Sequence, residues 1–416
     1  MRAELELVLC CARTEVNLIT AKRISTLLHA EIDYELFLGL ALSHRVVPLV
    51  YKNLYHAKFG PVPQQVLEDL KRFYLANVYR SLTMSKELMS ILKLFAANGI
   101  PAIPYKGPVL AISLYGHAAL REFDDLDILV AKEDVTNAVD LLISQGYRLQ
   151  KHFVCSTNRL HFEADLQCHW EYKLRSKNDQ VAVELHCLEG GRAYSYPFEF
   201  GSFWESGYSE RIGNEKVRMI KPESMLLVLC IHGAKHCWAR LQWLCDVAEL
   251  LRASKDLDWE MVIEQASTAK CERILFHGVL LAHDLLDAPL SRELIALGKR
   301  DPKVDLLTAQ KKRWLTSNSY PYASKKLQIF LYHFRTLKCN KGKIQYFLNQ
   351  FSYFLPYVPR AIRYTEMEEY RLSLPRSLFF LYYLIRLLKL STKYSMILLK
   401  FYWDVASEKK RRKSLG

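Results

Sequence analysis

Two aspartates stand two positions apart at the start of an apolar run. Asp125 and Asp127 open the segment Asp-Leu-Asp-Ile-Leu-Val. Alternate side chains of a β-strand point to the same face, so this spacing predicts two carboxylates side by side. Hard divalent cations such as Mg²⁺ bind carboxylate oxygens and share their remaining coordination with water and substrate phosphates. The pair therefore predicts a cation site, although so short a motif is also common at solvated strand ends.

Three residues upstream of this pair could bind the anion that such a cation carries. Gly107 lets the backbone approach a phosphate closely, and Lys106 supplies a charge to offset it. Arg121, four residues before Asp125, could make a forked contact with the same anion. The segment as a whole predicts a site for a metal-bound nucleotide.

A third acidic residue lies in a later alternating segment. Residues 181–186, Val-Ala-Val-Glu-Leu-His, place Glu184 and His186 on one face of a predicted strand. A third carboxylate on a neighbouring strand could complete a two-metal ligand set and help to activate an attacking hydroxyl. Glu184 is the first candidate, and Glu163 and Asp165 are weaker ones. The alternative is a solvated acid on an edge strand.

The order of these features resembles that of the bacterial "uncharacterised nucleotidyltransferase" family, a branch of the DNA polymerase beta-like nucleotidyltransferase superfamily. The matching residues are Lys106-Gly107, Tyr115, Arg121, Asp125-x-Asp127 and the Gly146-Tyr147 pair. In most of the superfamily a Gly-Ser pair precedes the acidic pair, whereas this sequence has Lys-Gly and a longer spacer. The resemblance covers residues 1–300, about seven tenths of the chain.

The resemblance implies a Mg²⁺-dependent enzyme that moves a nucleoside monophosphate from a nucleoside triphosphate such as ATP to an unidentified hydroxyl acceptor. Asp125 and Asp127 would hold two Mg²⁺ ions that bridge the triphosphate, and Glu184 would hold the ion that lowers the pKa of the acceptor hydroxyl. The residues implied to bind the nucleotide are Lys106, Gly107 and Arg121. Such chemistry is mostly positioning and electrostatics. The alternative is a catalytically silent relative that keeps the fold as a binding or scaffold protein at a membrane surface.

The elements that must position these residues form four segments. Residues 1–99 are predicted to be a helical layer, and residues 100–221 a nucleotidyltransferase catalytic core with a small mixed sheet. Residues 222–300 are predicted to be a helical domain packed on this core, and residues 301–416 a basic, aromatic-rich helical tail. The predicted fold class is therefore α+β, with N-terminal helices and a C-terminal all-helical region around the sheet.

In the first half of the chain, Pro, Asn and Gly residues that break helices and strands predict where single elements begin and end. A long helix is predicted from residue 64 to 97, with Asn98-Gly99 at its end. A short strand over 100–104, a helix over 108–115, the acidic strand and a helix over 134–145 follow. This succession is the minimal order of the superfamily that the chain resembles.

A second polar and aromatic group lies in the predicted helical region. His232 and His236 are one helical turn apart, and Arg240, Trp243 and Asp246 follow them. An i, i+4 histidine pair can bind zinc, but this segment has neither the adjacent glutamate of a metalloprotease nor a third ligand. The preferred interpretation is packing, or polar contact with the substrate, in the wall beside the nucleotide cleft that the resemblance implies.

The basic character of the chain belongs to its C-terminal quarter. The formal net charge is +14, and residues 311–416 carry 22 Lys and Arg against 5 Asp and Glu. Residues 375–403 place Lys and Arg along one stripe of an otherwise apolar helix, too charged for the ~18 apolar residues of a membrane span. Packing against residues 1–99 is the first interpretation, peripheral membrane contact is the second, and nucleic-acid binding is the last.

Cysteine usage and the start of the chain predict a cytoplasmic protein. Ten cysteines occur without a CxxC pair, which favours reduced thiols over a disulfide framework or a zinc ribbon. Two acids fall within the first six residues, and no basic segment precedes an apolar core as in a secretory signal. With 50% hydrophobic and 25% charged residues, the composition is that of a folded globular chain.

Overall fold

The N-terminal helices begin at side-chain caps. The computed structural model describes residues 2–57, 59–150, 171–187, 200–213, 215–316 and 325–337. The first helices are α1 (Ala3–Cys11), α2 (Leu18–Leu28), α3 (Tyr34–Ser43), α4 (Val47–Ala57) and α5 (Gln64–Ala97). At the start of α2 the Asn17 side chain accepts a hydrogen bond from the Thr20 amide at 2.9 Å, and Asp33 does the same for Leu36 in α3 at 3.0 Å.

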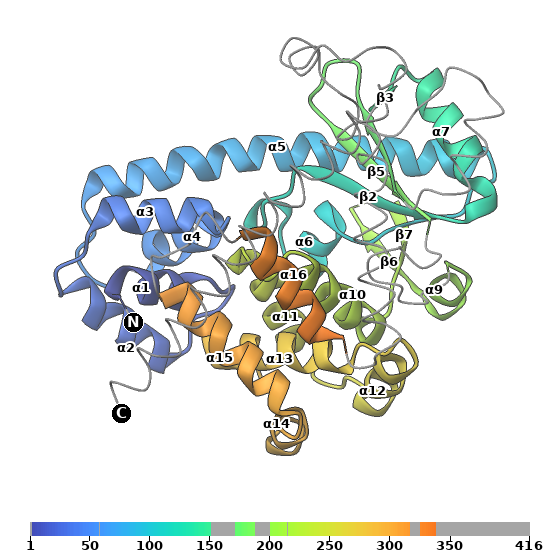
Figure 1. Ribbon diagram of the computed structural model, residues 1–416. Coiled ribbons are helices and arrows are strands. Elements are labelled where there is room, and N and C mark those ends of the chain that lie inside the picture. Colours follow the sequence, from blue (N-terminus) through green and yellow to red (C-terminus); the bar gives the residue numbers. More distant parts are fainter. Residues whose placement is uncertain are drawn as a thin grey trace, which may run out of the picture. The chain divides into compact units, whose positions relative to one another are not determined.

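Helix α5 extends from the N-terminal helices to the sheet, as Figure 1 shows. Val66 and Leu70 in its first turns belong to the hydrophobic cluster of the N-terminal helices. Leu88 and Phe95 near its end belong to a second cluster, which fills the space against the sheet. The bounds of α5 confirm the predicted helix, and Asn98 follows as its C-cap.

A five-stranded mixed sheet carries the acidic segment. Its strands are β1 (Ala102–Pro104), β2 (Asp125–Val130), β3 (Arg148–Leu149), β4 (Glu171–Arg175) and β5 (Ala182–His186). They lie in the order β1-β2-β5-β4-β3, in which only β2 and β5 pair in parallel. Between β1 and β2 lie α6 (Gly107–Tyr115) and the 3-10 turn η1 (Ala118–Leu120), and after β2 come η2 (Lys132–Asp134) and α7 (Val135–Ser144). Leu126 and Ile128 of β2 are buried in the cluster shared with α7, so the alternate positions face the opposite side.

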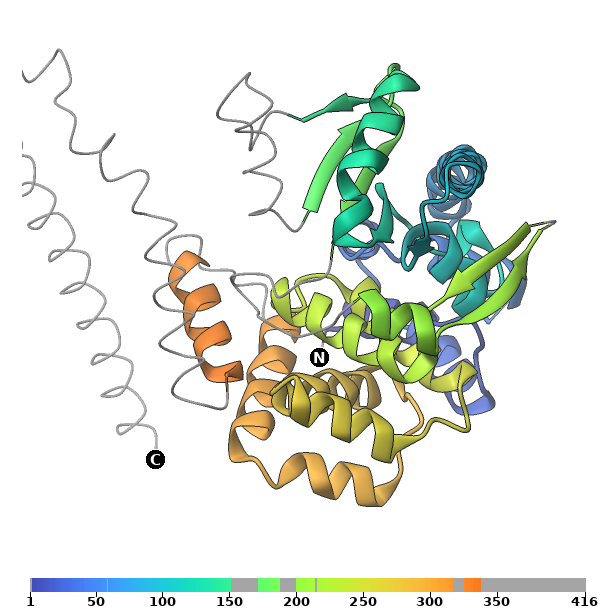
Figure 2. The ribbon, with the colours of Figure 1, turned by 90° about the vertical axis from the view of Figure 1, so that its right-hand side faces the viewer.

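The second half of the described chain is almost entirely helical (Figure 2). It begins with α9 (Phe200–Ser206) and the hairpin of β6 (Tyr208–Ile212) and β7 (Glu215–Met219). The helices that follow are α10 (Pro222–Lys235), α11 (Leu241–Ala253), α12 (Trp259–Thr268), α13 (Glu272–Leu286), α14 (Arg292–Lys299), α15 (Pro302–Thr316) and α16 (Lys325–Thr336). Asp258 caps α12 by accepting from the Met261 amide at 3.0 Å.

The hydrophobic core consists of two clusters. The larger one joins the N-terminal helices to α10, α11 and α13 through residues such as Leu7, Val50 and Leu244. The smaller one lies between α5, α7 and the sheet. The fold class is α+β, as predicted: a mixed sheet flanked by helices. Within the described ranges no helix is long and apolar enough to cross a bilayer. The predicted membrane-contact segment, residues 375–403, lies outside those ranges.

Candidate active site

Parallel pairing of β2 and β5 aligns the acidic residues of both strands. In the register Asp127 lies opposite Glu184, and Asp125 lies opposite Ala182. Side chains at paired positions point to the same face of a sheet, and so do those two residues further along each strand. Asp125, Asp127, Glu184 and His186 therefore share one face, the face that β2 turns away from α7.

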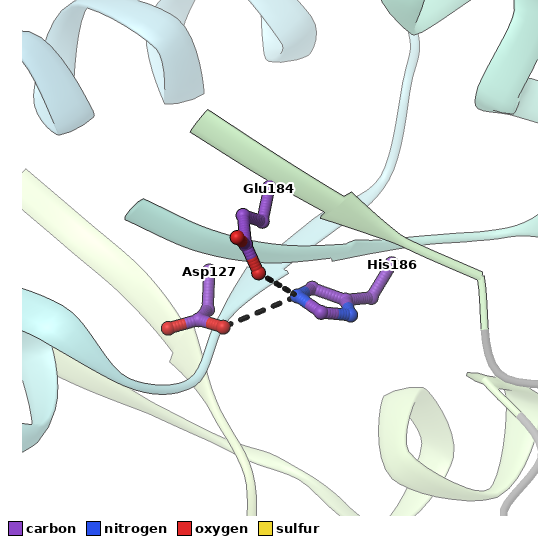
Figure 3. Close-up of side chains that lie close together, drawn as sticks. All are labelled: Asp127, Glu184 and His186. Carbon is purple, nitrogen blue, oxygen red and sulfur yellow. Dashed lines mark hydrogen bonds and ion pairs between the residues drawn. The ribbon is translucent and has the colours of Figure 1, made fainter. Parts of the chain in front are cut away.

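Three of these side chains converge, as Figure 3 shows for Asp127, Glu184 and His186. The Nε2 atom of His186 lies 3.1 Å from Asp127 Oδ1 and 3.7 Å from Glu184 Oε2. One ligand atom from each residue lies within 4.8 Å of the other two. Two carboxylates and an imidazole at this spacing are a donor set that fits a divalent cation.

Lysine side chains balance the charge of this group. Lys106 Nζ lies 3.0 Å from Asp127 Oδ1, and both side chains are buried. The ammonium of Lys106 also lies 4.8 Å from the centre of the Tyr105 ring. On the next strand, Lys173 forms an ion pair with Glu184. Because a buried carboxylate is stable only when it is paired, these lysines allow the acids to gather at one place.

The carboxylates of the pair differ in their affinity for a proton. Burial raises the pKa of Asp125, and the charges of Asp127 and Glu184 raise it further, to about 6. Burial acts in the same direction on Asp127, but Lys106 and His186 outweigh it and hold the pKa of Asp127 well below its usual range. Asp127 is therefore ionised at neutral pH, the state in which a carboxylate binds a cation.

Gly107 is required by the turn that places Lys106 beside β2. Its φ is +57°, in the left-handed region that favours glycine. A Cβ at this position would lie 3.3 Å from the backbone oxygen of Asp125. The lysine-glycine pair therefore brings the beginning of α6 into close contact with the acidic strand.

Arg121 is buried in an ion pair with α11. Its Nε and Nη2 donate to the two carboxylate oxygens of Asp246 at 2.7 and 2.9 Å. The Tyr115 hydroxyl donates to Asp246 Oδ1 at 2.7 Å. Burial alone would lower the pKa of Arg121, but the Asp246 carboxylate outweighs burial and raises it. This forked pair fastens α11 to the segment that leads into β2.

The histidines of α10 pack against a tryptophan of α11. The ring centres of His236 and Trp243 are 4.9 Å apart, and those of His232 and Trp243 are 5.6 Å apart. Burial lowers the pKa of His232, and the charge of Lys106 lowers it further. His232 is therefore neutral at pH 7, and Lys106 of the acidic group is close enough to contribute to this shift of its pKa.

The structure brings most of the predicted site residues together. Asp127, Glu184 and Lys106 are in contact, directly or through His186, and Asp125 and Gly107 lie next to them. Arg121 is instead held by a residue of another helix. The weaker candidates, residues 163 and 165, lie outside the described ranges.

The roles of two residues of the site were not predicted from the sequence: His186 as a ligand, and Asp246, which was named in the wall of the cleft, as the partner of Arg121. His186 was placed on the face of Glu184 but was not named as a ligand, although its position two residues further along an alternating strand was a usable signal. Asp246 lies 125 residues from its partner Arg121, and no local pattern connects them.

A mixed sheet with an acidic pair on one strand, a third acid on its parallel neighbour and a lysine-glycine turn ahead of both defines a nucleotidyltransferase core. The sequence model of the uncharacterised nucleotidyltransferase family matches residues 30–287, more than half of the chain. The chain belongs to this family, and it is an enzyme of the nucleotidyltransferase class.

Three solved structures show a distant similarity. A lincomycin-bound lincosamide antibiotic adenylyltransferase, LnuA, is 21% identical over 34% of this chain and 83% of its own, with a TM-score of 0.25. The antibiotic-resistance factor ANT(2'')-Ia is 13% identical over 45% and 91%, with a TM-score of 0.32. An antigenic nucleotidyltransferase-like protein from Paracoccidioides brasiliensis is 14% identical over 52% and 93%, with a TM-score of 0.27. No curated protein matches the sequence.

Proposed function

We propose that this protein transfers a nucleoside monophosphate from a nucleoside triphosphate to a hydroxyl acceptor with the help of Mg²⁺. The observation that carries the proposal is the convergence of Asp127, Glu184 and His186, with Lys106 on the same carboxylate oxygen, in a chain of the nucleotidyltransferase family. Oxygen-rich groups of this kind bind divalent cations together with substrate phosphates.

Each residue of the group has a proposed role. Asp125, Asp127 and Glu184 would hold two Mg²⁺ ions, and a bound ion would neutralise phosphate charge and lower the pKa of the acceptor hydroxyl. Lys106 would leave Asp127 for the phosphates once the cation has taken its place. The phosphate-binding residues proposed beside it are Gly107, through its close backbone approach, and Arg121, whose Nη1 does not donate to Asp246.

The transfer itself exchanges one phosphorus–oxygen bond for another. The acceptor oxygen bonds to the α-phosphorus, the bond from that phosphorus to the bridging oxygen breaks, and pyrophosphate leaves. The proton of the hydroxyl passes to the Glu184 carboxylate, which is only partly buried and can release it to solvent. The protein contributes position and charge, which is the usual share of an enzyme in phosphoryl-type transfer.

Calorimetric titration tests this proposal. The purified protein is titrated with ATP, GTP, CTP and UTP, each with and without Mg²⁺, beside the Asp125→Ala/Asp127→Ala double variant. We expect Mg²⁺-dependent binding of at least one triphosphate, lost in the double variant. The control is Asp140→Ala, which removes an exposed acid from α7, on the face of the sheet opposite to the site, and should bind as the wild type does.

Two results would contradict the proposal. One is the absence of binding under every condition, which would favour the silent scaffold. The other is nucleotide binding that survives the double substitution in a folded protein, since the acidic pair would then have no part in it. If Mg²⁺-dependent triphosphate binding is found, release of pyrophosphate in the presence of candidate hydroxyl compounds identifies the acceptor.

A further inference from the structure

The turn between α10 and α11 is held rigidly in place. Cys237 and Trp238 both have a positive φ, at 51° and 52°, which costs free energy in residues other than glycine. Trp238 offsets this cost by full burial in the space above Gly233 and Gly278, where an added Cβ would lie only 2.2 and 2.9 Å from its ring. The residues that follow this turn, Arg240 among them, therefore start from a well-determined position.

Arg240 is held by an aromatic ring and not by an acid. Its guanidinium carbon lies 5.5 Å from the centre of the Trp243 ring, and the His236 ring stacks on the same tryptophan. Trp243 is itself buried, so its ring gives the arginine a fixed support. Among the described residues, Arg240 has no carboxylate or carbonyl partner for its five N–H groups.

The position of Arg240 is tied to the acidic strand. At the start of α11, directly after Arg240, Gln242 donates to the backbone oxygen of Glu122, which lies three residues before β2. One turn later in α11, Asp246 holds Arg121. Burial and the neighbouring Arg45 lower the pKa of Arg240, whereas carboxylates that include Asp125 act in the opposite direction. The half-buried guanidinium therefore lies within electrostatic range of the site.

Neighbouring arginines of this region are already paired. Arg45 and Arg80 both form ion pairs with Asp124, and Arg121 pairs with Asp246. Within the part of the chain that the structure describes, Arg240 differs from these three in having no carboxylate partner. A partly buried guanidinium without an anionic partner costs free energy. A bound ligand that carries an anion would remove this cost.

We propose that Arg240 binds the phosphate chain of the nucleoside triphosphate and that Trp243 orients it for this contact. The proposal rests on the proposed function. A phosphate group accepts two parallel hydrogen bonds from a guanidinium and also neutralises its positive charge. A sugar hydroxyl or a base edge carries no negative charge and therefore cannot do both. Arg240 would approach the phosphates from the start of α11, and Lys106 from the start of α6.

The test compares the affinity of Arg240 variants for a nucleotide with and without its phosphates. Wild type, Arg240→Ala and Arg240→Lys are titrated with the triphosphate that binds best in the presence of Mg²⁺, and with the corresponding nucleoside. We expect Arg240→Ala to weaken triphosphate binding by about 10- to 100-fold, as loss of a charge-assisted contact does, and Arg240→Lys to lie between it and wild type. The dissociation constant of the nucleoside should change by less than about threefold.

Lys235→Ala is the matched control, since it removes an exposed positive charge from the last turn of α10. The Arg240 assignment is overturned if Arg240→Ala binds the triphosphate as wild type does, if it loses no more affinity than Lys235→Ala, or if it loses nucleoside affinity equally. Thermal melting shows whether each variant is folded, and Arg240→Gln replaces Arg240→Ala if the latter is not. A wild type that binds no triphosphate would contradict the proposed function itself, a result distinct from all of these.

Discussion

His186 adds a nitrogen ligand to a group that the sequence predicted as carboxylates alone. Its Nε2 atom lies near oxygens of both Asp127 and Glu184. Imidazole nitrogen binds transition-metal ions such as Zn²⁺, and to a smaller extent Mn²⁺, better than Mg²⁺, for which water and carboxylate oxygen are preferred ligands. The side chain therefore bears on which cation the site selects.

We predict that His186→Gln weakens Mn²⁺ binding by about 10- to 100-fold and Mg²⁺ binding by less, because the substitution removes a nitrogen ligand that only the softer ion uses well. Competition titration with both ions, followed by the paramagnetic resonance of Mn²⁺, measures the two affinities. His117→Gln, at an exposed position in the segment after α6, serves as the control. Equal losses for both ions would mean that His186 only orients Asp127.

The site residues that the sequence predicted are those with a local signal. Asp125 and Asp127 are marked by period-two spacing, and Gly107 by its lysine neighbour at the start of a helix. Arg121 looked equally local, but its orientation depends on Asp246, which reaches it only after α11 has packed against α6. Arg240 was named in the sequence only as a member of the polar and aromatic group after His232, and its place on the Trp243 ring is set by packing.

At the scale of elements, the packing of the Trp238 side chain determines how α10, α11 and α13 meet. The indole fills a space that exists because Gly233 and Gly278 have no side chains. A Cβ at Gly233 would lie 2.2 Å from the ring, and at Gly278 it would also lie 2.7 Å from the sulfur of Cys230. Neither distance is compatible with an unmoved tryptophan.

We predict that Gly278→Ala lowers the free energy of unfolding by about 3 kcal/mol, because the added methyl group overfills a closed core. Gly39→Ala is the control: it lies inside α3 with no atom within 4 Å of the new Cβ and should stabilise the protein by about 0.5–1 kcal/mol. Urea unfolding measures both. A Gly278→Ala protein as stable as wild type would show that Trp238 can move away at little cost.

Element bounds were predictable where a cap or a break accompanies the periodicity. The bounds of α5 agree with prediction for this reason. The helix α9 was not predicted, because its short apolar and aromatic sequence has no clear period. The pairing of β2 with β5 could not be predicted from the sequence, because the two strands lie more than 50 residues apart and their pairing depends on tertiary packing.

At the scale of the whole described structure, buried histidines link stability to pH. His277 lies under α15 and α16, where Nδ1 is 3.2 Å from the Thr308 hydroxyl, and burial lowers its pKa to about 3. Burial also lowers the pKa of His333 to about 4. Between these values and 6.5, the unfolded chain binds protons that the folded one does not, so stability falls as the pH drops below 6.5.

We predict that acidification from pH 7.5 to pH 5 destabilises the wild type and that His277→Phe removes about 2 kcal/mol of this loss, the linkage value for one such histidine. Urea unfolding at both pH values gives the change in the free energy of unfolding between them. Any effect of the phenylalanine that is the same at both pH values cancels in this comparison. Thr308→Val, which keeps the imidazole and removes only its hydrogen-bond partner, should retain the loss. An unchanged pH dependence in His277→Phe would assign the effect to other groups.

The 34 residues of α5 extend for about 50 Å and take part in both hydrophobic clusters. Near its middle, Asn77 donates to backbone oxygens on either side of Leu120, in the segment that leads into the acidic strand. Helix α5 therefore acts as a rigid rod between the N-terminal helices and the sheet, and a tilt of the rod at one end displaces the residues packed on its other end. A ligand that shifted the N-terminal helices would therefore move Asp125 and Asp127 without contacting them.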